Sequence, residues 1–176
     1  NQSPTVAWWA PEIYCWAKEF DLNTNVIATL MQIESCGLPE AESTSSAQGL
    51  FQVMPFNFPE AYQGRMQDPE INAEIGIQYY NYVFEKSGDN LLMAFAAYNG
   101  GPSKLNQPIG LWPEETQRYY YWAQMAIDAL QGAEQSDRLA EWLSTDGDKL
   151  CGAASEWQAA HLRDRTIAQG THEPGV

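Results

Sequence analysis

The chain has 176 residues, of which 23 are acidic and 9 are basic, so its formal net charge is -14. This length suggests one compact domain with room for an additional segment. The excess of acidic residues argues against nucleic acid as a ligand, because Lys and Arg supply most of the affinity for phosphates. No apolar run approaches the roughly 20 residues that span a bilayer, so we expect a soluble mature chain without a membrane span.

Two helices are predicted at the start of the chain. Residues 13, 16, 17 and 20 are apolar and recur at helical spacing after Pro11, which suits a first helical turn. A second helix begins at Asn23 or Thr24, both good caps, and ends at Gly37. Ser, Pro, Gly and Asn are frequent from residue 38 to 64, which predicts a loop with short helical turns near 50–53 and 59–62. Such loops can frame a cleft.

Three more helices are predicted in the centre of the chain. Asp68 and Pro69 form a cap and first-turn pair for a long core helix that continues to Ser87. Asn90 caps the next helix, which stops at residues 100–102, and the third runs from about 113 to 130. No segment shows strand alternation. The predicted fold class is therefore all-α.

The composition changes after residue 131, where charge and Gly increase. We therefore divide the chain into a catalytic domain at 1–131 and a C-terminal appendage at 132–176. Short helices are predicted at 137–143 and 153–163 of the appendage, and its polar end at 170–176 is expected to be frayed.

Three cysteines allow at most one disulfide within the chain. We favour Cys15 with Cys36, because both lie at or near helices that should pack early, whereas Cys151 lies in a late segment flanked by Gly and Ala. Free buried cysteines are an equally good interpretation. A disulfide would indicate an oxidising compartment.

Glu34 is the strongest single candidate for chemistry. Ile27, Leu30 and Met31 precede it by seven, four and three positions, so they share its face of the helix. Desolvation raises the pKa of a carboxyl group, which lets an acid remain protonated near neutral pH and donate to a glycosidic oxygen. Periodicity alone equally allows a glutamate that points into solvent at the last helical turn.

Several separated motifs resemble the soluble lytic transglycosylase (SLT) family and, more broadly, goose-type lysozyme. In chain order they are ESCG at 34–37, Ser43, AQGLFQVMP at 47–55, DPEIN at 68–72, AFAAYNGGP at 94–102, and Glu115–Thr116 with Tyr119. The similarity covers about 23–121 and implies a lysozyme-like fold with a cleft. The chain departs from the usual family pattern at Ser46, Phe51 and Gly100, which concerns the shape of the cleft more than its chemistry.

Carried over by position, the resemblance implies that Glu34 is the catalytic acid and base. It implies that the substrate-binding residues are Ser43, Gln52, Tyr98, Asn99 and Tyr119. Each of these residue types is more often a turn, surface or core residue than a ligand contact. Their joint occurrence is what favours the binding role. No metal and no cofactor are implied. Asp68 and Asn72 are interpreted as residues that fix a helix start.

The implied function is cleavage of the MurNAc-β-1,4-GlcNAc bond of peptidoglycan with a single glutamate, giving 1,6-anhydromuramyl products. The first alternative is hydrolysis of the same bond in the manner of goose-type lysozyme, in which water attacks in place of the C6 hydroxyl. A hydrolase that works with two carboxylates needs the second one at roughly 5–9.5 Å. Glu40 and Glu42 are the candidates for it, although neither is compelling. An inert glycan-binding module is the alternative from another class.

We expect a secreted, periplasmic or cell-envelope protein whose signal has been removed. The expected partners are peptidoglycan glycan strands, and the protein is expected to be a monomer. Because an acidic protein is repelled by anionic wall polymers, approach to the wall could depend on ionic strength or on a partner protein that binds the appendage.

Overall fold

The structure is a computed structural model that describes residues 2–132 and 136–170. These residues form eight α-helices and four short 3-10 helices, without a named strand, so the all-α prediction is confirmed. The α-helices are α1 Pro4–Ala7, α2 Ala10–Glu19, α3 Thr24–Ser35, α4 Pro69–Lys86, α5 Leu91–Gly100, α6 Glu114–Leu130, α7 Asp137–Ser144 and α8 Asp148–Gly170. The 3-10 helices are η1 Pro55–Asn57, η2 Glu60–Tyr62, η3 Pro102–Asn106 and η4 Ile109–Leu111. None of the described helices is long and apolar enough to cross a membrane. The frayed end was predicted at 170–176, of which residues 171–176 lie outside the described residues.

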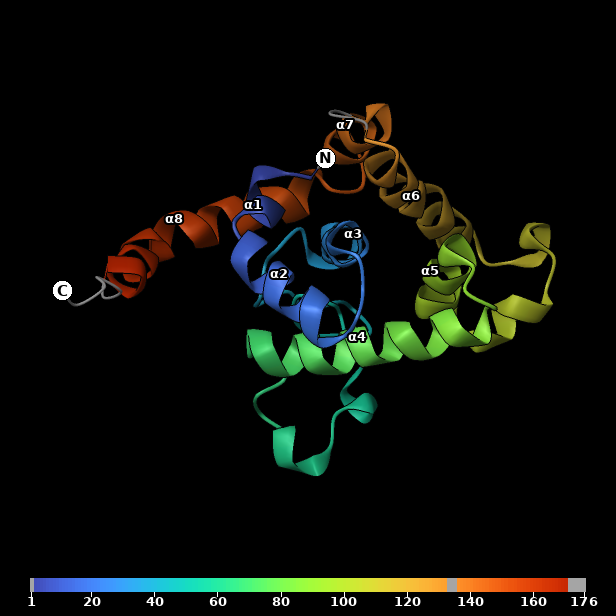
Figure 1. Cartoon of the computed structure of the whole chain (residues 1–176), viewed down its shortest axis with the longest axis horizontal. Helices are drawn as coiled ribbons and strands as arrows, with labels where there is room; N and C mark the ends of the chain where they lie inside the picture. The colour runs from blue at the N-terminus through green and yellow to red at the C-terminus, as the bar shows by residue number, and fades with distance from the viewer. Residues whose placement is uncertain (1, 133–135, 171–176) are drawn as a thin grey trace.

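Helix α3 lies at the centre of the fold and packs against α1, α2, α6 and α8. Figure 1 looks nearly along its axis, with α2 on one side and α6 on the other. The side chain of Asn23 caps it by accepting a hydrogen bond from the backbone N–H of Asn25. At the other end Cys36 adopts a left-handed conformation (φ 50°), which stops the helix directly after Glu34 and Ser35. The buried α3 residues form the main core together with residues of α2, α4 and α5.

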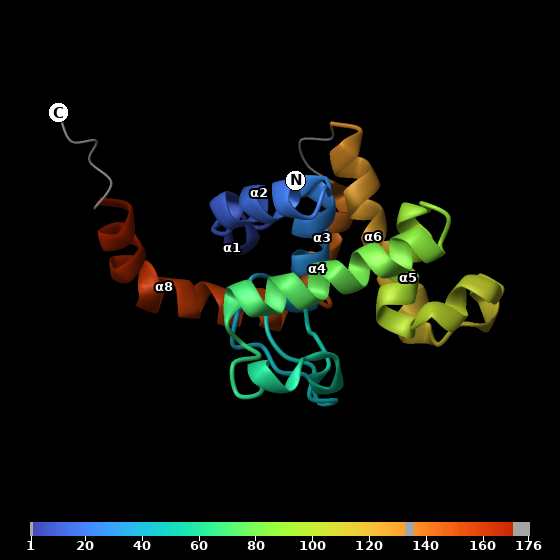
Figure 2. The ribbon, with the colours of Figure 1, turned by 60° about the horizontal axis from the view of Figure 1, so that its bottom comes forward.

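In Figure 2, helix α4 crosses in front of the lower part of α3, and α5 lies below one end of α4. Asp68 caps it, as predicted, by accepting hydrogen bonds from the backbone N–H groups of Glu70 and Ile71. Asn90 likewise caps α5 by accepting from the Met93 N–H. Helix α5 packs on both α4 and α6, so the three helices surround one side of the core.

The buried side chain of Asn72 makes three hydrogen bonds with the long segment between α3 and α4. It donates to the carbonyl oxygens of Gln48 (2.7 Å) and Met66 (2.9 Å) and accepts from the Phe51 N–H (2.8 Å). The Asn72 side chain leaves no room for a side chain at Gly49, where φ is +80°: a Cβ atom there would lie 2.3 Å from the side-chain amide nitrogen of Asn72. Asn72 therefore lies inside α4 and fixes the preceding loop, whereas the sequence interpretation assigned it to the helix start.

The appendage packs back onto the rest of the chain. Helix α7 contacts α6, and α8 contacts α1, α3 and α7. The Gln158 side chain donates to the carbonyl oxygen of Thr5 (2.7 Å), and the rings of Trp9 and Trp157 stack. Helix α8 begins five residues before the predicted start at 153 and continues beyond the predicted end at 163. Gly152 has a low propensity for the interior of a helix. Contacts with three other helices allow α8 to continue past this residue.

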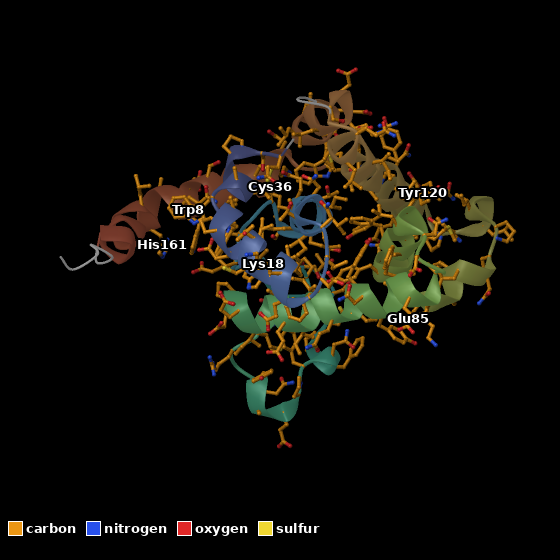
Figure 3. All side chains as sticks on the ribbon, in the orientation of Figure 1. Trp8, Lys18, Cys36, Glu85, Tyr120 and His161 are labelled. Carbon is orange, nitrogen blue, oxygen red and sulfur yellow. A yellow bond between two sulfur atoms is a disulfide. The ribbon has the colours of Figure 1, made fainter. Side chains whose placement is uncertain are left out.

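A disulfide joins Cys36 to Cys151 across 115 residues of sequence, and Cys15 is free and exposed. The predicted Cys15–Cys36 pair is therefore wrong. Cys15 lies on the solvent side of α2, whereas its neighbours Ile13 and Trp16 face the core. Cys36 lies where α1, α3 and α8 meet (Figure 3). The bond consequently connects the end of the central helix to the appendage.

We expect loss of this disulfide to lower the free energy of unfolding by roughly 2–5 kcal/mol, because the bond closes a long loop in the unfolded chain. Urea unfolding of Cys36→Ala/Cys151→Ala measures the effect. Cys15→Ser, which removes the exposed thiol, is the control and should change stability by less than about 0.5 kcal/mol. Titration of thiols in the denatured wild-type protein should detect one group, and three would contradict the assignment.

Candidate functional site

Glu34 is the penultimate residue of α3 and is only partly exposed. Its carboxyl group accepts a hydrogen bond of 2.5 Å from the hydroxyl group of Tyr119 in α6. The residues that share its helix face, Leu30 and Met31, are fully buried. The helix thus ends with its acidic side chain at the border between the core and the surface.

Burial raises the pKa of Glu34 from its ordinary value of 4.5 to about 8. The hydrogen bond from Tyr119 acts in the opposite direction, since it stabilises the carboxylate, and the negative charge of Glu115 adds to the rise. Burial is the largest of the three effects. The side chain is therefore a carboxylic acid, able to donate a proton, at neutral pH.

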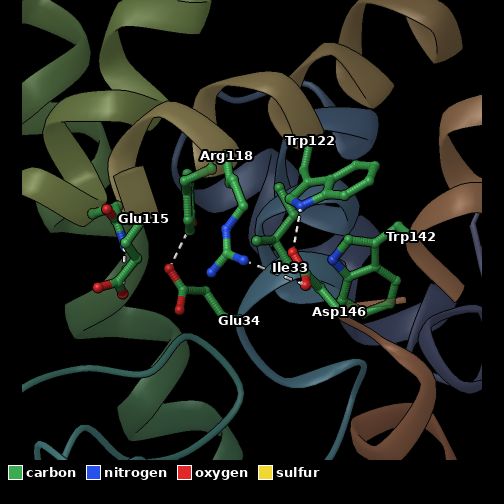
Figure 4. Close-up of a pocket in the computed structure, with 9 residues that line it drawn as sticks. Ile33, Glu34, Glu115, Arg118, Trp122, Trp142 and Asp146 are labelled. Atoms are coloured by element: carbon green, nitrogen blue, oxygen red, sulfur yellow. Dashed lines mark hydrogen bonds and ion pairs between the residues drawn. The ribbon is translucent and has the colours of Figure 1, made fainter. Parts of the chain in front are cut away.

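Glu34 opens into a pocket of about 330 Å³. Figure 4 shows Glu34 with Glu115 on one side and with Arg118, Asp146, Trp122 and Trp142 on the other. The lining residues come from α3, α5, α6 and the appendage: Ile33, Glu34, Asn99, Glu115, Arg118, Tyr119, Trp122, Trp142 and Asp146. Within residues 2–132 and 136–170, no three His, Cys, Asp or Glu side chains lie together in a way that could hold a metal ion.

Two of the predicted binding residues line this pocket. Tyr119 does so through its contact with Glu34, and Asn99 does so from the end of α5. The side-chain oxygen of Asn99 accepts from the Thr116 hydroxyl (2.8 Å), which fixes the amide relative to α6.

The other three predicted binding residues make hydrogen bonds with the loop backbone. The Ser43 hydroxyl accepts from the N–H of Ala47 (3.0 Å), and the Gln52 amide donates to the carbonyl oxygens of Ala41 and Gly49. The Tyr98 hydroxyl donates to the Phe51 carbonyl (2.7 Å). They lie outside the residues that line the pocket, and their binding role stays a prediction.

Sequence reasoning did not select most of the pocket wall. Glu115, Arg118 and Trp122 share a face of α6 with Tyr119, so helical spacing could have identified them. Trp142 and Asp146 come from the appendage and carry no such signal. Glu40 and Glu42, considered as second carboxylates, are exposed and lie outside the pocket lining, whereas Glu115 and Asp146 are part of it.

Comparison with protein families agrees with this arrangement. The protein-family model described as "Transglycosylase SLT domain" matches residues 13–120, more than half of the chain. The chain belongs to the SLT domain family. The predicted resemblance is thereby confirmed. Trp122, Trp142 and Asp146 lie outside the part of this SLT domain that the family model matches.

This SLT domain spans only a small part of the length of two soluble lytic murein transglycosylases that it resembles. The soluble lytic murein transglycosylase of Salmonella typhimurium is 33% identical over 101 residues, which are 51% of this chain and 16% of the relative. The Escherichia coli protein of the same name is 36% identical over 87 residues, 44% of this chain and 14% of the relative. The crystal structure of the 70 kDa soluble lytic transglycosylase from Escherichia coli superposes with a TM-score of 0.59 at 22% identity. The superposed region is 72% of this chain and 25% of the Escherichia coli chain. This likeness confirms the fold.

The raised pKa of Glu34 predicts a stability cost that depends on pH. The unfolded chain ionises this group near 4.5, whereas the folded chain keeps it protonated until about 8. Ionisation of the unfolded chain therefore lowers the free energy of unfolding as the pH rises from about 4.5 to 8, and below about pH 4.5 there is no such loss. We expect Glu34→Gln to raise the free energy of unfolding by roughly 1–4 kcal/mol at pH 8 and by little at pH 4.

Urea unfolding at the two pH values measures this difference. Glu114→Gln, an exposed glutamate outside the pocket, is the control for the loss of one acidic charge. An equal gain at pH 4 and pH 8 for Glu34→Gln would show that its carboxyl group is not desolvated.

Proposed function

We propose that this SLT domain is a peptidoglycan lytic transglycosylase that cleaves the MurNAc-β-1,4-GlcNAc bond, with Glu34 as its acid and base. The observation that carries the proposal is a carboxyl group that lines a pocket, accepts a hydrogen bond from Tyr119 and has a pKa raised to about 8 by burial. Membership of the SLT family and the names of the relatives support the same substrate class.

The chemistry requires one group to donate and then accept a proton. Glu34 gives its proton to the glycosidic oxygen as the bond to C1 of the muramyl sugar breaks, and the GlcNAc end leaves with a hydroxyl group. The acetamido group of the substrate stabilises the positive charge at C1, as in substrate-assisted glycosidases. The Glu34 carboxylate then takes the proton of the C6 hydroxyl, whose oxygen bonds to C1. The products are the anhydro sugar and a reprotonated Glu34.

The surroundings of Glu34 suit both steps. A pKa near 8 keeps the acid protonated at neutral pH, and it makes the carboxylate a better base than an exposed glutamate. The Tyr119 hydroxyl stabilises the ionised form between the two steps, because it donates to the carboxyl oxygen. No cofactor is needed in this sequence.

Hydrolysis of the same bond is the second candidate function. Glu115 and Asp146 place two further carboxylates in the pocket, and either could activate a water molecule in place of the C6 hydroxyl. The two reactions differ in product mass, since the transglycosylase product is lighter by one water.

We also propose that the protein works outside the cytoplasm. The Cys36–Cys151 disulfide supports this location, because disulfides persist in oxidising compartments such as the periplasm and the extracellular space.

Mass spectrometry of muropeptides after digestion tests the reaction. We expect 1,6-anhydromuramyl ends, whereas reducing ends would favour the hydrolase and no release would favour an inert glycan-binding module. Glu34→Gln should lower turnover by at least about 100-fold, because the amide cannot donate the proton. Glu40→Gln, an exposed glutamate in the following loop, should retain activity. Unchanged turnover in Glu34→Gln contradicts the assignment.

The pH dependence of kcat/KM tests the role of the acid. Activity should fall above about pH 8, since Glu34 must be protonated to act. Glu115→Gln should move this alkaline limb to lower pH, because the Glu115 charge raises the pKa of Glu34. Glu114→Gln is the matched control on the same helix. If the alkaline limb does not move in Glu115→Gln, the limb does not report the ionisation of Glu34.

A further inference from the structure

One pocket residue, Arg118, has no role in the proposed bond cleavage. It precedes Tyr119 in α6, and its guanidinium group lies between Glu34 and Asp146 in the view of Figure 4. The side chain is 57% exposed and lies 3.9 Å from the carboxylate of Asp146. This distance is too long for a hydrogen bond, and the guanidinium donors make none with the described residues. They are therefore open to a ligand.

We propose that Arg118 and the appendage form an anion-binding subsite for the carboxylate that peptidoglycan carries on its muramyl side group. This inference rests on the proposed function, since it names the substituent that the same pocket recognises. The carboxylate is either the free lactyl group of a bare glycan or an acidic group of the stem peptide.

The pocket wall beside Arg118 is built by the appendage and α6. Asp146 follows α7 and accepts a hydrogen bond from the Trp122 indole N–H (2.9 Å), so its carboxylate is anchored to α6. Trp142 is buried in the same wall of the pocket, and a Cβ atom at Gly147 would lie 2.2 Å from the Trp142 ring. Trp122, Trp142 and the disulfide residue Cys36 belong to one buried cluster. The wall beside Arg118 is thus preorganised, which lowers the cost of binding.

The charges around the pocket make Arg118 the group that an anionic ligand requires. The chain carries a net charge of -14, so an anionic polymer is repelled at long range. Among the residues that line the described pocket, Arg118 is the one cationic side chain, beside the acidic residues Glu34, Glu115 and Asp146. Local attraction at the pocket therefore depends on Arg118. A guanidinium group also matches a carboxylate in geometry, because it can donate two parallel hydrogen bonds.

Binding to the inactive Glu34→Gln protein tests the inference without turnover. Isothermal titration would use three oligosaccharides of equal length: a neutral GlcNAc oligomer, a GlcNAc–MurNAc oligomer with free lactyl groups, and the same oligomer with stem peptides. We expect Arg118→Gln to weaken binding of one or both anionic oligomers by about 10- to 100-fold and to leave the neutral oligomer unchanged. The oligomer that loses more affinity identifies the carboxylate.

Two further variants sharpen the experiment. Arg65→Gln removes an exposed arginine that is likewise paired with an aspartate, Asp68, but lies outside the pocket lining. It should not change the preference. Arg118→Lys should recover part of the affinity, because it keeps the charge and loses the paired donors.

Three outcomes overturn the inference while leaving the proposed function intact: no loss in Arg118→Gln, an equal loss for neutral and anionic oligomers, or the same loss in Arg65→Gln. If the Glu34→Gln protein binds none of the three oligomers and the wild-type protein releases no muropeptides, the proposed function fails and the inference fails with it.

Discussion

The hydrogen bond from Tyr119 to Glu34 joins the end of the central helix α3 to α6, and the site depends on it. It holds the acid at a position that the core has largely desolvated, and it partly offsets the energetic cost of that position. Without this donor the ionised carboxylate would be less stable at that position, which would hinder the second proton transfer of the proposed reaction. The packing of α3 against α6 therefore determines both the position and the acidity of Glu34.

Much of the fold follows from local sequence. Asn23, Asp68 and Asn90 cap their helices as the sequence predicts, because a cap needs only a short polar side chain and the next two or three backbone N–H groups. Helix α8 is longer than predicted, since contacts with α1, α3 and α7 stabilise residues whose own propensity is weak. Asn72 shows the same limit, because its hydrogen bonds hold a loop up to 24 residues away.

The candidate site divides in the same way. The apolar residues on its helix face made Glu34 a candidate, and the resemblance to a family was needed to select it. Tyr119 and Asn99 followed from the same resemblance. Trp142 and Asp146 could not be selected, because they reach the pocket only through the packing of α7 on α6. The pairing of Cys36 with Cys151 was missed for a related reason. Early packing of the first two helices favoured Cys15, but the face of α2 that carries Cys15 is turned to solvent.

The long span of the disulfide has a consequence for the order in which the molecule is completed. Synthesis proceeds from the N-terminus, so α3 and most of its neighbours are made well before Cys151 exists. Until the second cysteine has been added and an oxidant is present, the pocket wall beside Arg118 is held by noncovalent contacts alone. Formation of the disulfide is thus a late step in maturation. A chain kept in a reducing environment would still contain Glu34 but would lack the covalent bond that joins the end of α3 to α8.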